Sequence, residues 1–175
     1  MDEGTKVKLY QYKRIIVMVS NIQIDSVLGG VANYSGCFSL DEIDLIKPST
    51  LKDPSSFVLN TFERRFSQGG HWLLVTFFKD KSEVEIFDSL GMPSLIPSRI
   101  GNTLLHFGNL IHTTKLLQNP LSDCCGLYVI GRSISINRGQ SLKRFLDNFG
   151  QDNHKNDTLM NRVVAQYLNG NISES

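Results

Sequence analysis

Four side chains in the middle of the chain have the types that a cysteine nucleophile requires. A thiol attacks a carbonyl efficiently only as the thiolate, so it needs an imidazole within hydrogen-bond reach, a group that orients this imidazole, and donors for the developing oxyanion. His71, Asp88, Gln118 and Cys125 supply these types. The acid follows the histidine by 17 residues, and the glutamine precedes the cysteine by seven. The chemistry open to this set is covalent attack on an acyl carbon followed by hydrolysis.

Each of the four residues also has an ordinary structural explanation. A histidine beside a tryptophan is usually structural, an aspartate at the end of a strand usually caps a turn, and a Cys-Cys-Gly run in an apolar segment usually packs in the core. It is the joint occurrence in this order and spacing that favours catalysis. The other histidines, His106, His112 and His154, have no such neighbours, so we interpret them as surface or partly buried residues.

The segments around the four residues resemble the motifs of a known protease family. They read Gly69-Gly-His71-Trp72, Phe87-Asp88-Ser-Leu-Gly91 and Gln118-Asn-Pro-Leu-Ser-Asp-Cys-Cys125-Gly126. In order and spacing they are similar to the active-site motifs of the adenovirus-type maturation cysteine proteases, the adenain family. This family lies within the clan that also holds the SUMO and ubiquitin-like proteases. The resemblance covers roughly residues 30 to 140, within a single cysteine-protease domain expected to span residues 1 to 175.

The resemblance implies a role for each of the four residues. Cys125 would be the nucleophile and His71 its base, while Asp88 would hold the imidazole in place. The Gln118 side chain and the Cys125 backbone N–H would bind the oxyanion. The implied reaction is peptide-bond hydrolysis through an acyl-enzyme, and it needs no metal or organic cofactor.

Two adjacent cysteines compete for the role of nucleophile. In the family the nucleophile directly precedes a glycine, and Gly126 has no Cβ that would obstruct substrate and backbone. This favours Cys125. Cys124 would lie six residues after Gln118, as in the SUMO-protease branch, but would place a cysteine where that branch has glycine. We expect Cys124 to point into the core, and we assign no role to Cys37.

Three residues beside the motifs are expected to bind substrate. Trp72 and the Gly69-Gly70 segment would narrow the groove next to the nucleophile, so that glycine is preferred immediately before the scissile bond, with an apolar anchor further upstream. Gly126, which has no Cβ, would let the substrate approach. Trp72 has an equally good explanation as a buried strand anchor. The expected partners are protein and peptide substrates.

The chain departs from the adenoviral pattern in two places. The adenoviral enzymes have glutamate where this chain has Asp88, whereas other branches have aspartate. Their activating peptide is disulfide-bonded to a cysteine eleven residues before the catalytic glutamine, and here that position is Phe107. We therefore expect no disulfide-linked activating peptide. DNA, the second adenoviral activator, requires a basic surface, and a formal charge of +1 predicts weak DNA binding at most.

Three function classes fit these motifs. The first is a maturation protease that cleaves precursor proteins of a virus or a virus-derived element at Gly-containing sites, and this is the one we favour. The second is a SUMO-protease-like or deubiquitinase-like enzyme with the same catalytic residues. The third is a non-catalytic scaffold, which would not require all four residues.

The elements that must position these residues can be read from hydrophobic periodicity. Apolar runs predict strands at 72–78 and 83–88, joined as a hairpin that brings His71 and Asp88 together. The apolar residues within 9–36 fit neither the helical nor the strand period, so this segment is expected to form either a helix or a strand. We further expect a short strand and loop over 38–45 and a strand at 110–117. Helices are expected at 55–66, 98–107, 124–137 and 157–168. The fold class is α+β, with a central mostly antiparallel or mixed β-sheet packed against helices and the nucleophile at the N-terminus of a buried helix.

Bulk composition limits the cellular setting. With 175 residues and 41% hydrophobic content, the chain can bury one full core. Its three cysteines do not make a disulfide framework, so we expect an intracellular, reducing compartment, and the host nucleus or the virion if the protein is viral. The first apolar run, Ile15 to Val19, is too short for a signal peptide or a membrane span, so we expect no membrane partner.

Overall fold

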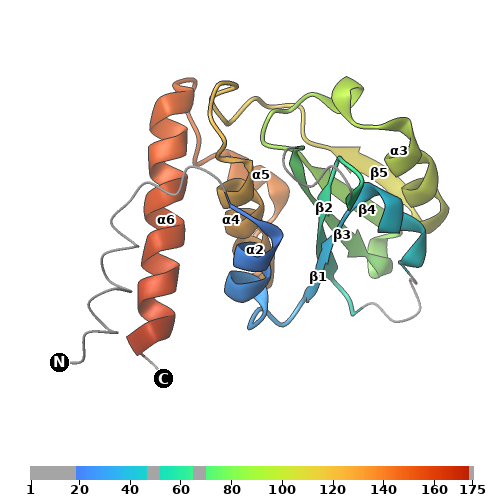
Figure 1. Cartoon of the computed structure of the whole chain (residues 1–175), viewed down its shortest axis with the longest axis horizontal. Helices are drawn as coiled ribbons and strands as arrows, with labels where there is room; N and C mark the ends of the chain where they lie inside the picture. Colours follow the sequence, from blue (N-terminus) through green and yellow to red (C-terminus); the bar gives the residue numbers. More distant parts are fainter. Residues whose placement is uncertain (1–18, 47–51, 65–69, 174–175) are drawn as a thin grey trace.

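The structure, a computed structural model, describes residues 19–46, 52–64 and 70–173. One five-stranded β-sheet stands between two sets of helices (Figure 1). The elements follow in the order α2 (Asn21–Leu28), β1 (Tyr34–Phe38), a 3₁₀ helix (Leu40–Leu45), β2 (Ser55–Asn60), β3 (Trp72–Phe78), β4 (Glu83–Phe87), α3 (Ser98–Leu104), β5 (Asn109–His112), α4 (Cys125–Asn137), α5 (Leu142–Leu146) and α6 (Asn153–Ser173).

The sheet is mixed, as the sequence predicted. Its strand order is β1-β2-β3-β4-β5, so each strand pairs with its neighbours in sequence. The two inner pairs, β2 with β3 and β3 with β4, are antiparallel, while the outer pairs are parallel. The predicted hairpin is confirmed, with Leu74 opposite Phe87 and Val75 opposite Ile86.

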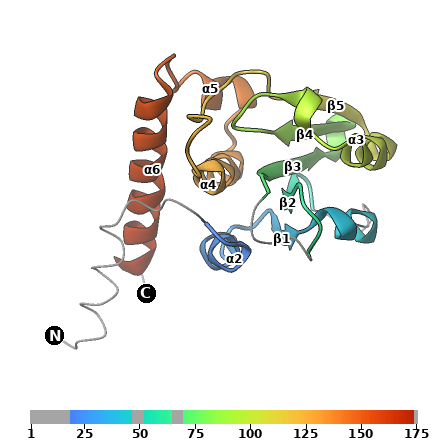
Figure 2. The same cartoon turned by 45° about the horizontal axis from the view of Figure 1, so that its top comes forward.

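Both faces of the sheet are covered by helices, which explains why β3 is apolar throughout. Leu73, Val75 and Phe77 belong to a core cluster that includes Ile100 and Leu104 of α3. On the other face Leu74 joins a second cluster, which contains Leu127 of α4 and Met160 and Val164 of α6. The layers are visible in two views, with α2 and α4 between the sheet and α6 (Figures 1 and 2). A strand that is buried on both faces needs no polar alternation.

The predicted helix at 55–66 is wrong, because Ser55–Asn60 form strand β2. All six residues are buried and pair in full register with β3. Ser55, a residue type that is favoured at helix N-caps, bonds through its hydroxyl to that of Ser35 at 3.1 Å, and the Ser56 hydroxyl donates to Asn33 O at 3.4 Å. Pairing on both edges outweighs the local capping signal. Residues 65 and 66 lie outside the described part of the chain.

Other boundaries also differ from the expectations. Leu40–Leu45 is a 3₁₀ helix rather than a strand, because Ser39 and Glu42 form a capping box at its start. Strand β5 ends at His112, well before residue 117. Helix α6 runs over Asn153–Ser173 and is longer than predicted. The helices at 98–107 and 124–137 are confirmed, the first as α3 followed by a 3₁₀ turn.

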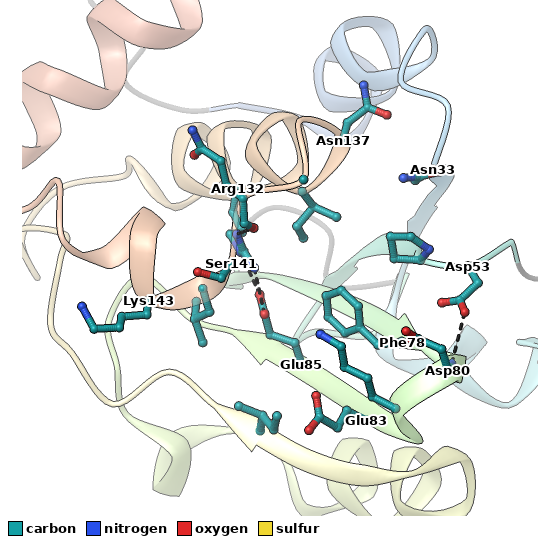
Figure 3. Close-up of a pocket in the computed structure, with 17 residues that line it drawn as sticks. Asn33, Asp53, Phe78, Asp80, Glu83, Glu85, Arg132, Asn137, Ser141 and Lys143 are labelled. Atoms are coloured by element: carbon teal, nitrogen blue, oxygen red, sulfur yellow. Dashed lines mark hydrogen bonds and ion pairs between the residues drawn. The ribbon is translucent and has the colours of Figure 1, made fainter.

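Helix α4 is fixed to the sheet by a buried ion pair. The Arg132 guanidinium is fully buried and donates to both carboxylate oxygens of Glu85 on β4, each at 2.8 Å. It also donates to Ser135 Oγ and to Gln140 O. The two partners form one wall of a pocket of about 650 Å³, where Figure 3 shows Arg132 directed from the helix toward Glu85. Among the described residues, no helix has the length and apolar character needed to span a membrane.

Candidate active site

The β3–β4 hairpin places His71 beside Asp88. His71 immediately precedes β3 and Asp88 immediately follows β4, so the two residues meet at one end of an antiparallel pair. His71 Nε2 lies 2.6 Å from Asp88 Oδ1, which is hydrogen-bond distance. The predicted proximity of these two residues is therefore confirmed.

Asp88 is buried and held in one orientation by its own turn. Its carboxylate accepts hydrogen bonds from the backbone N–H groups of Leu90, at 2.8 Å, and Met92, at 3.1 Å. Burial acts to raise the pKa of Asp88, but the hydrogen bond and charge of His71 and the two backbone donors outweigh it and hold the pKa below its usual value. Asp88 is therefore an anion that can orient and stabilise a protonated imidazole.

The pKa of His71 depends on Asp88, to which it bonds, and on Cys125. Burial acts to lower the pKa of His71, but hydrogen bonds to Asp88 and Cys125, together with their negative charges, raise the pKa to about 9. Since Nε2 bonds to Asp88, Nδ1 is the ring nitrogen that remains for the thiol. At neutral pH His71 is then an imidazolium beside the Asp88 carboxylate, and a protonated imidazole of this kind can stabilise a neighbouring thiolate.

Cys125 is the first residue of α4. At this position its backbone N–H has no carbonyl one turn earlier in the helix to accept it, and the helix dipole favours negative charge. The predicted helix start at the nucleophile is confirmed. The N–H is available to bind an oxyanion.

Gln118 is buried, and both ends of its amide are fixed. Oε1 accepts a hydrogen bond from Ser89 Oγ at 2.7 Å, and Nε2 donates to Ser122 O at 2.5 Å. The amide nitrogen carries a second hydrogen, which is the one that could serve an oxyanion. Ser89 O in turn accepts from the backbone N–H groups of Leu117 and Gln118. The turn that contains Asp88 therefore also fixes the glutamine.

The other two cysteines are poor nucleophile candidates. Cys124 is 8% exposed and belongs to the core cluster, and burial raises the pKa of its thiol. Burial likewise raises the pKa of Cys37, which is hydrogen-bonded to Tyr34, to about 12. Both thiols stay protonated at neutral pH, whereas Cys125 is the cysteine that raises the pKa of His71.

The residues predicted to bind substrate have packing roles in the structure. A Cβ on Gly126 would lie 2.6 Å from Cβ of Val19, so the absence of a side chain there admits Val19. The indole Nε1 of Trp72 donates to Val19 O at 3.0 Å, and its ring packs against the core. Gly70 is exposed beside His71, has φ of +86°, and lies close to the Asn60 side chain. Substrate contact by these three residues stays a prediction.

Val19 and Ser89 are residues that the sequence did not single out. Val19 contacts Gly126, next to Cys125, and accepts the hydrogen bond from Trp72, next to His71. Ser89 bonds to Gln118. No motif signals a packing valine, while the serine in Asp88-Ser-Leu-Gly91 could have been noticed as a polar residue beside the acid.

The pocket of Figure 3 is separate from this site. Its wall comprises residues of β4 and of the C-terminal part of α4, with Asp53 and Asp80 on the far side (Figure 3), and includes neither His71 nor Cys125. Within the described ranges, no group of three or more histidine, cysteine, aspartate or glutamate side chains is arranged to hold a metal ion.

The fold is similar to that of two proteases of known structure. The crystal structure of the ASFV pS273R protease matches with a TM-score of 0.56 and 18% identity, over 82% of this chain and 66% of that one. The chain thus spans slightly less than two thirds of that protease. SUMO protease Ulp1, with its catalytic cysteine oxidized to a sulfonic acid, matches with a TM-score of 0.51 and 18% identity, over 85% of this chain and 76% of Ulp1.

These similarities show the fold class. The chain has the α+β architecture of the Ulp1-like proteases, with a mixed five-stranded sheet packed against helices. No protein-family model matches the sequence, and no curated protein matches it.

Proposed function

We propose that the chain is a cysteine endopeptidase. The observation that carries this proposal is the position of His71, which bonds to Asp88 at 2.6 Å and whose pKa is raised by both Asp88 and Cys125. Asp88 and Cys125 raise the pKa of His71 to about 9, so that His71 is protonated at neutral pH and can stabilise the thiolate that attacks the substrate. A scaffold would have no need of this arrangement.

The reaction follows from the geometry. The Cys125 thiolate attacks the peptide carbonyl, and the oxyanion is held by the Cys125 backbone N–H and the free N–H of the Gln118 amide. His71 then gives its proton to the leaving amine, and the C–N bond breaks. The neutral imidazole activates a water molecule that hydrolyses the thioester and regenerates the thiol. No step requires a metal or an organic cofactor.

The substrate that we propose is a precursor protein of a virus or a virus-derived element, cleaved at Gly-containing sites during particle maturation. The motifs shared with the adenovirus-type proteases and the fold shared with the ASFV protease support this choice. The enzyme would act inside the cell in a reducing compartment, in the nucleus or the virion. The likeness to Ulp1, described as a SUMO protease, supports a second candidate, a protease specific for ubiquitin-like proteins.

Substrate profiling separates these two candidates. The protein is reacted with a peptide library and with electrophilic probes built on the C-termini of ubiquitin and SUMO. A maturation protease cleaves peptides after glycine, with leucine, isoleucine or methionine upstream, and ignores the probes. Labelling by one probe, without peptide cleavage, identifies the second candidate. A strong preference for a bulky or charged residue immediately before the scissile bond would contradict the proposal that the chain is a maturation protease.

Matched cysteine variants test the nucleophile in the same assay. Cys125→Ala is expected to lower kcat by about 10⁴-fold or more, because it removes the thiol that the proposed mechanism uses as nucleophile. Cys124→Ser is expected to retain most of the activity. Substantial turnover by the Cys125→Ala variant would overturn the assignment.

A further inference from the structure

Helix α6 is bonded to the loop that carries the proposed oxyanion donor. One carboxylate oxygen of Asp157 accepts from Ser122 Oγ at 2.8 Å, and the other accepts from the Tyr128 hydroxyl at 2.9 Å. The backbone N–H of Asn119 points to the same carboxylate, at 3.4 Å. One acidic side chain on α6 thus accepts hydrogen bonds from both the loop and α4.

The loop residue that Asp157 holds is the one that orients Gln118. The carbonyl of Ser122 accepts the hydrogen bond from Gln118 Nε2 at 2.5 Å. On the other side of Gln118, the amide of Asn156 donates to Leu117 O at 3.0 Å. Two consecutive residues of α6 therefore fix the chain before and after the glutamine.

Asp157 determines which of two hydrogen bonds the Ser122 hydroxyl makes. Ser122 Oγ lies 2.9 Å from Asn119 O and 2.8 Å from Asp157 Oδ2, but the hydroxyl has one proton to donate. A carboxylate is the stronger acceptor, so the proton goes to Asp157. Without the carboxylate the hydroxyl turns back to Asn119 O, and Ser122 loses its tie to α6.

We propose that Asp157 is a positioning residue that acts through Ser122 on Gln118 and thereby sets the place of the oxyanion donor. This inference rests on the proposed cysteine-protease function. Oxyanion stabilisation depends on donors fixed before the reaction, and removal of one such donor typically lowers kcat by about 10²–10³-fold. Displacement of the donor, rather than its loss, should have a smaller effect on the same step.

Two small probes separate the oxyanion donors from the nucleophile. p-Nitrophenyl acetate acylates Cys125 through a tetrahedral oxyanion, forming a C–S bond and releasing p-nitrophenolate. Iodoacetamide alkylates the same thiolate by displacement of iodide at a saturated carbon, which forms no oxyanion. Asp157→Ala is expected to slow acylation by about 10-fold. It should leave alkylation within about twofold of wild type, because the Cys125–His71 pair is untouched.

Matched variants control for charge and folding. Asp157→Asn keeps one acceptor oxygen and is expected to fall between wild type and Asp157→Ala. Asp152→Asn removes a carboxylate at the start of the same helix, where it bonds only to Lys155 side-chain and nearby backbone donors, and should acylate at the wild-type rate. Ser122→Ala should slow acylation about as much as Asp157→Ala. The Ser122→Ala/Asp157→Ala double variant should be no slower than either single variant, since both act in one chain of contacts.

The outcomes are separable from those of the proposed function. If the Asp157→Ala variant folds and is acylated as fast as the wild type, the inference about Asp157 is wrong, while the proposed protease function is unaffected. Equal loss of acylation and alkylation also overturns it, because Asp157 would then support the whole site rather than the oxyanion donor. If wild-type Cys125 is neither acylated nor alkylated faster than a free thiol, the proposed function itself is wrong.

Discussion

At the scale of single residues, His71 determines the charge state of the site. Burial alone would keep its imidazole neutral, yet Asp88 and Cys125 raise its pKa to about 9. The pKa of Asp88 moves in the opposite direction, below its usual value, largely because of His71. Both shifts favour the same ion pair, so the charged form is stable over the neutral range.

The first prediction concerns this ion pair. Asp88→Asn removes the negative partner, so the pKa of His71 should fall well below 9. The midpoint can be followed by NMR titration of the His71 ring. Because the folded-state pKa is raised, the pair stabilises the fold fully below the unfolded pKa of about 6.5, and this contribution is lost as pH rises toward about 9.

Urea unfolding between about pH 6 and pH 9.5 provides the control for that prediction. The wild-type free energy of unfolding should fall across this window by more than that of Asp88→Asn. Equal slopes, or an unchanged His71 midpoint in the variant, would show that Asp88 does not hold the proton on the imidazole.

The site could be predicted from the sequence only where chemistry restricts the residue type. A thiol, an imidazole, a carboxylate and an amide donor have few substitutes, so Cys125 and His71 could be recognised from order and spacing. Val19 and Asp157 could not, because the one acts by packing against Gly126 and the other by bonds to a loop far away in sequence. Many residue types at many positions can pack against a glycine or form hydrogen bonds to a distant loop.

At the scale of elements, α4 must hold its first residue steady against the sheet. The buried Arg132–Glu85 pair joins the middle of α4 to β4, the strand that leads into Asp88. The aromatic ring of Phe145 on α5 lies under the guanidinium, 5.6 Å from ring centroid to Arg132 Cζ. These contacts tie the nucleophile helix and the hairpin into one unit.

The second prediction tests this tie. Arg132→Met is expected to lower the free energy of unfolding by about 3–5 kcal/mol, because it leaves the Glu85 carboxylate buried without a partner. Combining it with Glu85→Leu should recover much of that loss, since no charge then remains buried. Urea denaturation of both variants is the measurement. A double variant less stable than Arg132→Met would contradict the argument.

A helix or strand could be predicted where the local sequence pattern favours the same secondary structure as its packing in the folded protein. The β3–β4 hairpin could be predicted because two apolar runs flank a short polar turn. Strand β2 lies where the sequence predicts a helix, since a serine such as Ser55 is also favoured at helix N-caps, and pairing with β1 and β3 makes the segment a strand. Helix α6 begins earlier than expected because its first turn is polar.

At the scale of the whole molecule, positive and negative charges nearly balance. The chain has 18 basic and 17 acidic residues, and some of them form exposed pairs such as Lys143 with Asp147 and Lys155 with Asp152. A balanced surface attracts few phosphates and releases few counterions on contact with a nucleic acid.

The third prediction follows from this balance. Added duplex DNA should change the rate of peptide cleavage by less than about twofold at physiological salt. The assay compares rates with and without DNA at low and physiological salt. Stimulation of several fold that disappears on raising the salt would reveal a basic surface that the net charge conceals.

The contact between α6 and the Gln118 loop affects when the proposed site can form during synthesis of the chain. Helix α6 is made after all four residues of the proposed site, and the 48 residues that follow Cys125 up to Ser173 take the ribosome about 2 to 10 s at ordinary rates of synthesis. During that interval the nascent chain contains its nucleophile and base, but Ser122 and Gln118 lack the carboxylate that orients them. A growing chain would then become competent only after α6 has been made, and would not cut its neighbours before that point.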